Sequence, residues 1–465
     1  MALPTATTEG GIFELVARGN KDAYFFQDLP DSKFLFDSAY DPQAAFSYEI
    51  RRVPPYTSAE FGRTVEFEFD LVGDVMRDPT LLIQLPTWLP PVQAKIANRS
   101  IIQDASGVTY GYTLGIAYWL FETIQFYQDN ILLQEFAAET LWGLARAQGT
   151  YAHSFVTTEL TGEDKVHNAP PLFRLQLPLV GCQAEGDPGF PQRGCTRHVY
   201  RLRCKLRRLE DIVEASDSRT KPTPWGRVLY IKSSSAGSFT PFKTLERSEI
   251  GPPIIQLETT QVYVEREIQD DLATKPQKLP FKRYFLNTFS QNRKDYLSVI
   301  NGGTSPLTRR LDGRHPTSRL IWFFRSQQDT DANKLWKIST PTDGSYYNTT
   351  SLLIAGQTRE LPRGPMVWRD LTNLAKEDID TDSEISSMNW TLGAIAPLRF
   401  PTAGSNAQPT GTINMTTADR PTFYIDATSP GDSPMAPFTQ LFVIAEGWAQ
   451  FETDGKGGAD LMSQN

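Results

Sequence analysis

Three cysteines and a histidine lie near one another in the sequence and carry the donor atoms that zinc prefers. Cys182, Cys195, His198 and Cys204 could supply three thiolates and one imidazole, a chemically acceptable set for Zn²⁺. The stretch has no Cys-x-x-Cys pair to begin metal binding, and His198 and Cys204 fall within one alternating segment. We therefore predict no metal site here. Three unevenly spaced cysteines are also too few for a disulfide framework, which favours folding in a reducing compartment.

No residues are spaced for catalysis. The four histidines are scattered and mostly stand beside proline or polar residues; they are His153, His167, His198 and His315. A catalytic histidine needs a nucleophile and an orienting acid close in space, and nothing local suggests either. Carboxylates are plentiful, but spacing alone singles out no acid/base pair. We predict no catalytic residue, no cofactor-binding residue and no cofactor, and we expect that the protein is not an enzyme.

One glycine-rich segment near the end of the chain resembles a phosphate-binding loop only superficially. It reads Gly455-Lys456-Gly457-Gly458. It lacks the full spacing, the Lys-Ser/Thr pair and the following helix of such a loop. We predict a flexible tail instead.

A basic stripe follows one side of a predicted strand, while Tyr200, Leu202, Cys204 and Leu206 alternate on the other side. The basic residues are Arg201, Arg203, Lys205, Arg207 and Arg208. The chain carries 46 basic and 54 acidic side chains, a net charge of −8, which gives no support for a nucleic-acid-binding surface. The stripe therefore predicts a solvated or subunit-facing strand surface, and direct binding of nucleic acid is not expected.

The elements that would hold these residues are mostly short strands. Residues 64–71 alternate strictly, with Val65, Phe67, Phe69 and Leu71 on one face, as in a half-buried strand. The runs Leu320–Phe324 and Leu441–Ala445 are apolar on both faces, which is typical of buried sandwich strands.

Composition agrees with an all-β chain. Hydrophobic residues make up 40% of the sequence and charged residues 22%, with 33 Pro and 32 Gly as turn residues. Helix is scarce: only Leu132–Ala147 follows a helical spacing of apolar residues. We therefore expect many strands with short helical insertions.

The length of 465 residues favours two domains. The polar, breaker-rich stretch Asp270–Pro280 is the preferred linker, so we place an N-terminal arm at 1–30, a first domain at 31–269 and a second at 270–465. No internal repeat is legible in the sequence. No signal peptide is visible, and the uncharged stretch 105–121 is too interrupted to span a membrane. We expect synthesis in the cytoplasm without a spanning segment.

Four Asn-x-Ser/Thr triplets occur, at Asn98, Asn348, Asn389 and Asn414. Glycosylation in a host secretory pathway would require a signal that the sequence does not show. We expect Asn348, in a polar loop, to be the best acceptor among them.

Six segments together resemble one known family. They occur in the family's order and are spread over nearly the whole chain: Gly10–Tyr24, Leu175–Leu179, Leu257–Asp271, His315–Trp322, Gln408–Asp419 and Gly455–Asn465. In Gln408–Asp419, a Pro409/Gly411 turn leads to a strand with Ile413 and Met415 on one face. The chain is similar in these segments to the major capsid proteins of nucleocytoplasmic large DNA viruses.

This resemblance implies a fold and an assembly. The expected fold is all-β, a double jelly roll of two tandem eight-stranded antiparallel jelly rolls with short helical insertions. Family members form pseudo-hexagonal homotrimers that tile an icosahedral shell over an internal membrane. The resemblance thus implies as partners the chain itself, neighbouring capsomers, and minor capsid and penton proteins, with the membrane contacted only indirectly. The implied location is the virion, after synthesis in the host cytoplasm, with the N-terminal segment beneath the capsomer.

Two alternatives remain open at this stage. Jelly rolls also occur in carbohydrate-binding β-sandwich proteins and in enzymes such as glycoside hydrolases and cupins. The first would need an aromatic platform in one set of loops. The second would need convergent carboxylates or a histidine-rich metal motif, and the histidine count disfavours a cupin.

Overall fold

The computed structural model describes about two thirds of the chain. The described residues are 45–88, 101–147, 159–164, 166, 170, 172–183, 187–216, 221–232, 239–290, 307–312, 316–338, 347–365, 367–368, 396–399, 412–415, 418, 420–427 and 438–462. Antiparallel sheets dominate these ranges. The predicted N-terminal arm, residues 1–30, lies outside them, as do Pro409 and Gly411.

The first half of the chain forms a barrel of two four-stranded antiparallel sheets. One sheet, here the β1 sheet, has the spatial order β1 (Phe46–Val53), β13 (Ile254–Val264), β3 (Val75–Gln84), β8 (Leu172–Gln176). The other, the β2 sheet, has the order β2 (Thr64–Glu68), β9 (Tyr200–Leu206), β6 (Phe121–Gln128), β7 (Ile131–Ala137). Counted along the chain, the first, last, third and sixth strands share one sheet, and this is jelly-roll topology.

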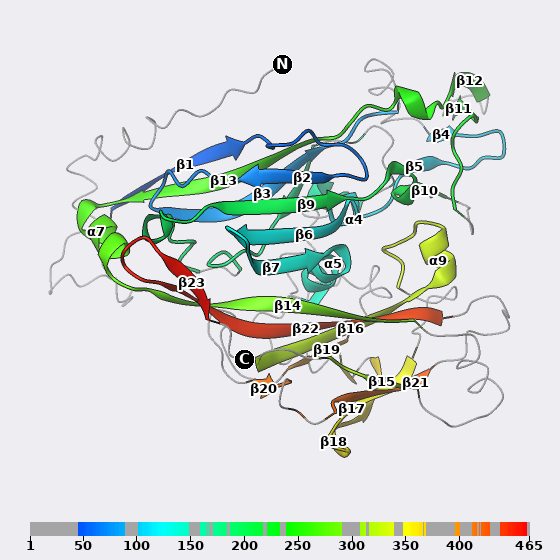
Figure 1. The fold of residues 1–465 in the computed structure, drawn as a ribbon. Helices are drawn as coiled ribbons and strands as arrows, with labels where there is room; N and C mark the ends of the chain where they lie inside the picture. Colours follow the sequence, from blue (N-terminus) through cyan, green and yellow to red (C-terminus); the bar gives the residue numbers. More distant parts are fainter. Residues whose placement is uncertain are drawn as a thin grey trace, which may run out of the picture.

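The second half repeats this order. The β14 sheet contains β14 (Lys278–Ser290), β22 (Phe438–Thr453), β16 (Pro316–Ser326) and β19 (Ala396–Arg399). The β15 sheet contains β15 (Leu307–Arg310), β21 (Thr422–Ala427), β17 (Tyr347–Ile354) and β18 (Gln357–Arg363). Two short strands extend the β14 sheet: β20 (Ile413–Asn414) pairs with β16, and β23 (Ala459–Met462) pairs with β22. The repeat that the sequence hides is therefore visible in the strand order, and the predicted double jelly roll is confirmed (Figure 1).

Two insertions of the first barrel build small sheets beyond its end. Both lie between barrel strands: one between β3 and β6, the other between β9 and β13. Their strands are β4 (Ile101–Gln103), β5 (Tyr110–Tyr112), β10 (Val213–Ala215), β11 (Val228–Lys232) and β12 (Phe239–Thr244). They pair as β12-β11-β4 and β10-β5 and lie at the upper right of Figure 1. Short 3₁₀ turns also occur, η2 (Gln192–Cys195), η3 (Leu209–Asp211) and η4 (Arg247–Glu249).

Helices in the described ranges are short. They are α4 (Ile116–Trp119), α5 (Ala138–Ala147), α7 (Arg266–Thr274) and α9 (Gln327–Asp331). Helix α7 joins β13 to β14, and the boundary expected at residue 270 falls inside it. No helix among the described residues is long and apolar enough to cross a membrane.

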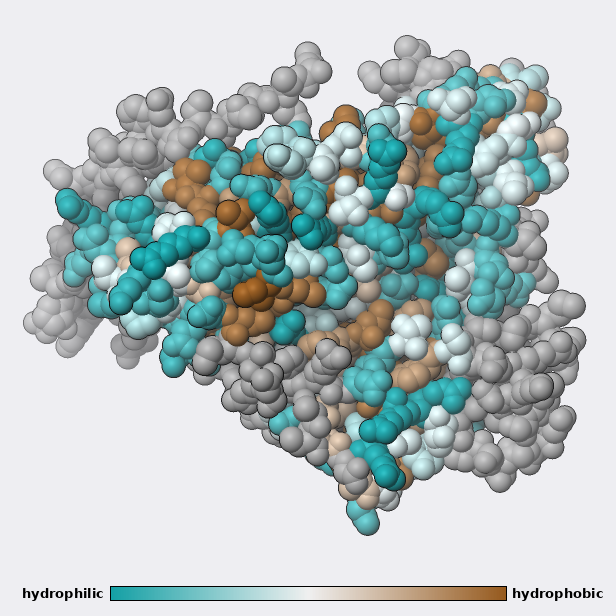
Figure 2. All heavy atoms as spheres, viewed as in Figure 1, coloured by the Kyte–Doolittle hydropathy of each residue, from teal (hydrophilic) through white to brown (hydrophobic). Residues whose placement is uncertain are grey.

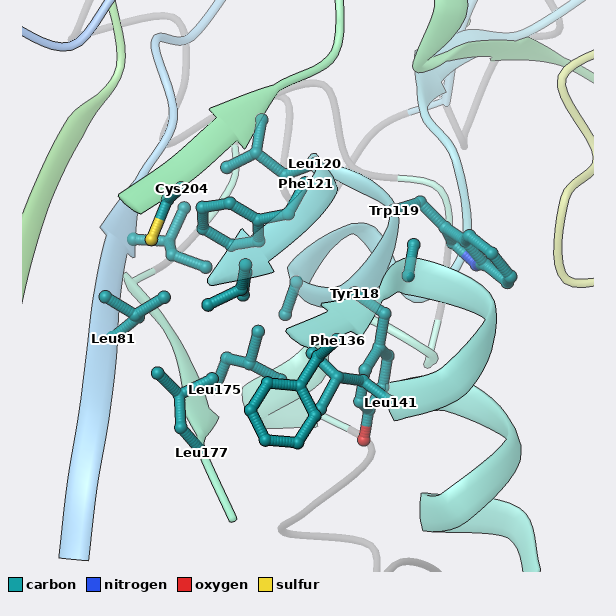
Figure 3. Close-up of a cluster of buried hydrophobic side chains, with 14 of the residues drawn as sticks. Leu81, Tyr118, Trp119, Leu120, Phe121, Phe136, Leu141, Leu175, Leu177 and Cys204 are labelled. Atoms are coloured by element: carbon teal, nitrogen blue, oxygen red, sulfur yellow. The ribbon is translucent and has the colours of Figure 1, made fainter. Parts of the chain in front are cut away.

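The core of the first barrel follows from strand alternation. Val65 and Phe67 of β2 are fully buried, as their period of two predicts. In Figure 3, Leu81 of β3, Phe121 of β6, Leu175 of β8 and Cys204 of β9 converge on one apolar cluster. Side chains from both sheets therefore meet in the interior, as a sandwich requires.

The predicted helix at Leu132–Ala147 is half wrong. Residues 131–137 form strand β7, and only Ala138–Ala147 are helical. The register of β7 against β6 shifts at Leu133, between the pairs Phe126–Gln134 and Tyr127–Leu132. This bulge brings Leu133 to the buried side with Phe136, so two apolar residues three apart share a face without a helix.

The predicted flexible tail at 455–458 is also wrong. These residues turn β22 into β23, and the Asp454 carboxylate accepts hydrogen bonds from the backbone N–H groups of Lys456 (2.7 Å) and Gly458 (2.8 Å). Gly455 (φ 67°) and Gly457 (φ 87°) adopt left-handed conformations that only glycine takes at low cost. A closed hairpin, and no phosphate-binding loop, is the result.

The glycosylation triplets have different settings. Asn348 is exposed, but it lies on strand β17 and not in a loop. Asn414 is exposed on β20. Asn98 and Asn389 lie outside the described residues. Ile413 and Met415 both contact the second core, as predicted from their spacing.

A matched pair of glycines tests the hairpin. A Cβ at Gly455 would collide with the backbone carbonyl of Thr274 in α7, whereas Gly107 (φ 82°) has open space around it. Gly107→Ala should lower the free energy of unfolding by about 1 kcal/mol, from positive φ alone. Gly455→Ala should cost roughly 2 kcal/mol or more, because strain and collision add. Urea unfolding of both variants measures this, and equal losses would show that the hairpin does not pack on α7.

Candidate functional site: the junction of the two barrels

The strands at the centre of the β14 sheet are buried on both faces. Leu320–Phe324 of β16 pairs residue by residue with Leu441–Ala445 of β22, and every side chain in both runs is at most 4% exposed. Leu320, Trp322 and Phe324 point into the second barrel. Their neighbours Ile321 and Phe323 belong to the core cluster of the first barrel. The double-sided apolar pattern seen in the sequence therefore marks a sheet shared by two cores.

Helix α5 supplies the other side of this junction. It follows β7 in the first barrel, and its residues Leu141, Trp142 and Leu144 are buried. The rings of Trp142 and Phe323 meet edge to face with centroids 5.4 Å apart. Gly143 lets the helix approach closely, because a Cβ there would lie 2.7 Å from Ile444 Cδ1. Aromatic and aliphatic burial between the barrels is the main source of cohesion here.

A buried ion pair crosses the junction. Arg325 of β16 donates to Glu139 of α5, Nη2 to Oε1, at 3.1 Å, and Arg207, which directly follows β9, approaches the same oxygen at 3.4 Å. The Arg325 guanidinium also donates to the Leu335 carbonyl (3.2 Å) and lies 4.6 Å from the centroid of the Phe442 ring. Burial acts to raise the pKa of Glu139, but the two guanidinium groups outweigh it and hold the pKa below its usual range. The carboxylate is thus ionised and fixes the helix against the sheet.

Two glutamines of the first barrel cover the edge of the β14 sheet. Gln183 accepts from the backbone N–H of Lys282 (2.6 Å) and donates to its carbonyl (2.8 Å). Gln134 of β7 donates to the same carbonyl (3.0 Å) and accepts from the Val180 N–H (2.9 Å). Edge strands leave backbone groups unpaired, and here side chains of the other barrel satisfy them.

A second buried ionic cluster lies within the β14 sheet. Glu446 of β22 accepts from Arg319 Nη2 at 2.6 Å and contacts Lys282 Nζ at 3.1 Å, all three side chains being at most 8% exposed. Burial acts to raise the pKa of Glu446, but Arg319 and Lys282 lower it from 4.5 to about 2. Its strand partner Tyr284 packs on Phe136 of β7, so the cluster sits beside the junction.

A polar contact joins the barrels near α9. Asn333 donates to the carbonyls of Glu210 and Val213, both at 2.7 Å, and its own carbonyl accepts from Thr113 Oγ1 at 2.9 Å. Trp336 Nε1 donates to Glu214 at 3.0 Å. Burial raises the pKa of Glu214, partly offset by these donors. Asn333 adopts a positive φ of 59°, which asparagine tolerates better than most residues.

The structure does not bring the candidate zinc ligands together. Cys204 is buried in the first core, and burial raises its pKa. Cys195 lies in η2, where burial raises its pKa to about 12, and Cys182 Sγ contacts the Met76 carbonyl at 3.4 Å. His198 Nδ1 instead contacts Asp129 at 2.6 Å. Within the described ranges no group of three or more His, Cys, Asp or Glu is placed to hold a metal ion. His153, His167 and His315 lie outside those ranges.

The basic stripe is neutralised within the chain. Arg203 pairs with Glu66 (2.8 Å) and Arg201 with Glu68 (3.4 Å), because those residues face each other across β2 and β9. The remaining pairs are Lys205 with Glu122 (2.8 Å), Arg207 with Glu139 (3.4 Å) and Arg208 with Asp211 (3.2 Å). Every cation of the stripe thus has a carboxylate partner, which removes the charge excess that phosphate binding would need.

Comparison with known proteins finds matches among solved structures. No protein-family model and no curated protein matches the chain. VP54 of PBCV-1, in a crystal structure fitted into a reconstruction of the virophage Sputnik, shares 13% identity over 93% of this chain and 100% of its own, with a TM-score of 0.67.

Two further solved structures are similar. The Faustovirus major capsid protein has 11% identity over 90% of this chain and 92% of its own, with a TM-score of 0.57. The mavirus major capsid protein has 10% identity over 95% and 94%, with a TM-score of 0.50. At such identities the likeness establishes the fold. Coverage of at least 90% of this chain means that the likeness includes both barrels.

The close approach of α5 is testable at Gly143. Its Cβ position lies 2.7 Å from Ile444 Cδ1 and 3.3 Å from Phe323 Cε1, inside a packed core. Gly143→Val should lower the free energy of unfolding by about 1–3 kcal/mol, because overpacking displaces buried side chains. Gly251→Val is the control, since nothing lies within 4 Å of its Cβ position. Chemical denaturation compares the two, and an unchanged Gly143 variant would contradict the tight helix–sheet contact.

The Glu446 cluster predicts a pH dependence. The folded pKa of about 2 lies below the ordinary 4.5, so the folded state binds fewer protons and its stability rises with pH between these values. The ionised carboxylate should contribute roughly 3 kcal/mol above pH 4.5 and lose it progressively towards pH 2. Urea unfolding of wild type and Glu446→Gln from pH 3 to 6 measures this. The variant should show a shallower slope, and parallel profiles would refute the assignment.

Proposed function

We propose that this protein is a major capsid protein that assembles into pseudo-hexameric homotrimers. One observation carries the proposal: two jelly rolls of identical strand order follow each other in the chain, and the whole pair matches solved capsid proteins over at least 90% of both chains. The Faustovirus and mavirus proteins are both major capsid proteins. The six ordered sequence resemblances point in the same direction.

The physical character of the molecule suits this role. Three chains with two barrels each provide six similar walls, so a trimer approximates a hexagon and can tile a surface. The junction locks the two barrels of one chain into a fixed geometry, which tiling requires. The small sheets built from β4, β5, β10, β11 and β12 stand beyond the barrel end, where they can vary without disturbing the walls.

The proposal extends to place and partners. We infer that trimers pack beside neighbouring capsomers in the shell of a large DNA virus and meet minor capsid and penton proteins. The protein would be made in the host cytoplasm and reside in the virion, touching an internal membrane only indirectly. We propose α7 as the boundary between the domains, near residue 270, and assign no catalytic, cofactor-binding or metal-binding residue.

Oligomeric state tests the proposal directly. The purified full-length chain should elute as a species of three chain masses in size-exclusion chromatography with light scattering, and negative-stain electron microscopy should show particles of hexagonal outline. The physical reason is that each chain supplies two barrels, so three chains are needed to close a ring of six walls. A strict monomer at all protein concentrations and salt conditions, or one that hydrolyses glycans, would overturn the proposal.

A further inference from the structure

Strand β14 is the outermost strand of its sheet, and its second edge faces the first barrel. It pairs with β22 over its full length without a bulge, so odd-numbered and even-numbered residues direct their backbone groups to opposite sides. The carbonyl of Gln277, just before the strand, accepts from the Thr453 N–H at 2.9 Å, which places the odd-numbered side toward β22. The even-numbered residues therefore point their backbone groups at the open edge. Pro280 is one of them, and proline within a sheet is confined to such positions.

Side chains of the first barrel cover only one end of this edge. Gln183 and Gln134 bond the backbone groups of Lys282. At Tyr284 and Leu286, which come next on the same side, no strand of the described ranges pairs with β14. An edge whose backbone groups lie outside any ladder can accept an added strand, and many proteins bind extended peptides in this way.

A cleft of about 420 Å³ opens along this uncovered stretch. Ala137 of β7 forms one wall, residues 284–287 of β14 form the other, and Thr140 of α5 also lines it. Strand β7 runs beside β14 in Figure 1, and Figure 2 shows hydrophobic atoms along this boundary between the barrels. Residues 284–287 extend over roughly 10 Å, at about 3.3 Å per residue. The cleft therefore suits a few residues of an extended chain.

Two carboxylates flank the cleft, and the described residues that line it include no lysine or arginine. Glu135 of β7 is exposed and accepts from the Gln125 side chain at 3.0 Å. Asp312, which follows β15, is also exposed, and its backbone N–H donates to the Asn287 side chain at 3.3 Å. The cleft thus joins an unpaired strand edge to a negative rim, and a positively charged occupant would complement it.

We propose that this cleft binds an extended peptide segment of another protein, which adds to the edge of β14 and carries a basic side chain to Glu135 and Asp312. Backbone pairing with Tyr284 and Leu286 supplies an attraction common to any sequence, and the carboxylates select for positive charge. The apolar atoms of Ala137 and Leu286 favour aliphatic side chains at the alternate positions of the peptide. The site goes beyond the proposed function, because it does not depend on how copies of the chain associate.

Fluorescence anisotropy on the purified full-length protein tests the site with synthetic peptides. The probe is a labelled hexapeptide of alternating valine and lysine, which offers one aliphatic and one basic face. It should bind saturably. A hexapeptide with glutamate in place of lysine should bind at least about tenfold more weakly, because its charges meet like charges. The valine–lysine peptide with methylated backbone nitrogens should also bind at least about tenfold more weakly, because it cannot donate to the strand edge.

Two substitutions at one position isolate the edge pairing. Leu286→Pro removes the backbone N–H that points at the cleft and leaves the ladder with β22 intact, as Pro280 does on the same strand. Leu286→Ala shortens the side chain but keeps the N–H. The proline variant should bind the valine–lysine peptide roughly threefold to tenfold more weakly than the alanine variant, since one hydrogen bond is lost.

A pair of double variants isolates the charge. Glu135→Gln with Asp312→Asn removes both carboxylates of the cleft. Glu267→Gln with Asp270→Asn removes two exposed carboxylates of α7, outside the cleft, and serves as the control. Only the first double variant should bind the valine–lysine peptide more weakly, by roughly threefold or more. Circular dichroism verifies the folding of each variant.

Saturable binding that these changes weaken as stated supports the site. Absence of saturable binding would overturn it. Binding that persists with the methylated peptide and in the Glu135/Asp312 variant would also overturn it, since the peptide would then adsorb elsewhere on an acidic protein. If Leu286→Pro does not fold, the methylated peptide and the double variants decide. Light scattering gives the oligomeric state of the same samples: a trimer that binds no peptide leaves the proposed function in place, and a monomer that binds the peptide leaves the site in place.

Discussion

The molecule depends on one sheet whose central strands are buried on both faces. Ile321, Phe323 and Ile444 fill the space under α5, while the residues between them fill the second barrel. Each such side chain gains roughly 1.5–3 kcal/mol from burial. Separating the barrels would expose one complete face, so the two jelly rolls behave as one unit. Neither barrel can be treated as an independent domain with a solvated outer wall.

Polar groups set the angle at which this apolar contact is made. The ion pair between Arg325 and Glu139 joins the sheet to the helix. The Gln183 side chain hydrogen-bonds both the backbone N–H and the carbonyl of Lys282. A buried ion pair adds little net stability against apolar alternatives, but breaking it by removing one partner is costly. Apolar packing tolerates small rotations, whereas these bonds do not. The junction therefore combines cohesion from burial with orientation from hydrogen bonds.

The sequence predicted which side of a strand is buried better than it predicted which distant residues contact each other. The two-sided apolar runs at Leu320–Phe324 and Leu441–Ala445 correctly indicated buried strands, but pattern alone could not show that one side belongs to another barrel. The acidic side of 64–71 and the basic stripe were both visible, yet their pairing depends on register, which arises only when distant strands meet. The helix assigned from Leu132 failed because a β-bulge imitates helical spacing over two residues. The Glu446 and Glu139 clusters gave no local signal, since their cations come from strands remote in the chain.

Strand order also determines when the second barrel can fold during synthesis. Strand β22 lies between β14 and β16, although it is the last long strand of the chain. A growing polypeptide that has reached residue 437 holds every other principal strand of the second barrel but lacks the one that joins them. Its two apolar surfaces stay open until that strand arrives, so folding of this half waits for the synthesis of β22 (Phe438–Thr453). Because this central strand follows the other principal strands of its barrel, the shared sheet forms only after they have been synthesised, and chains that end before residue 438 are left without it.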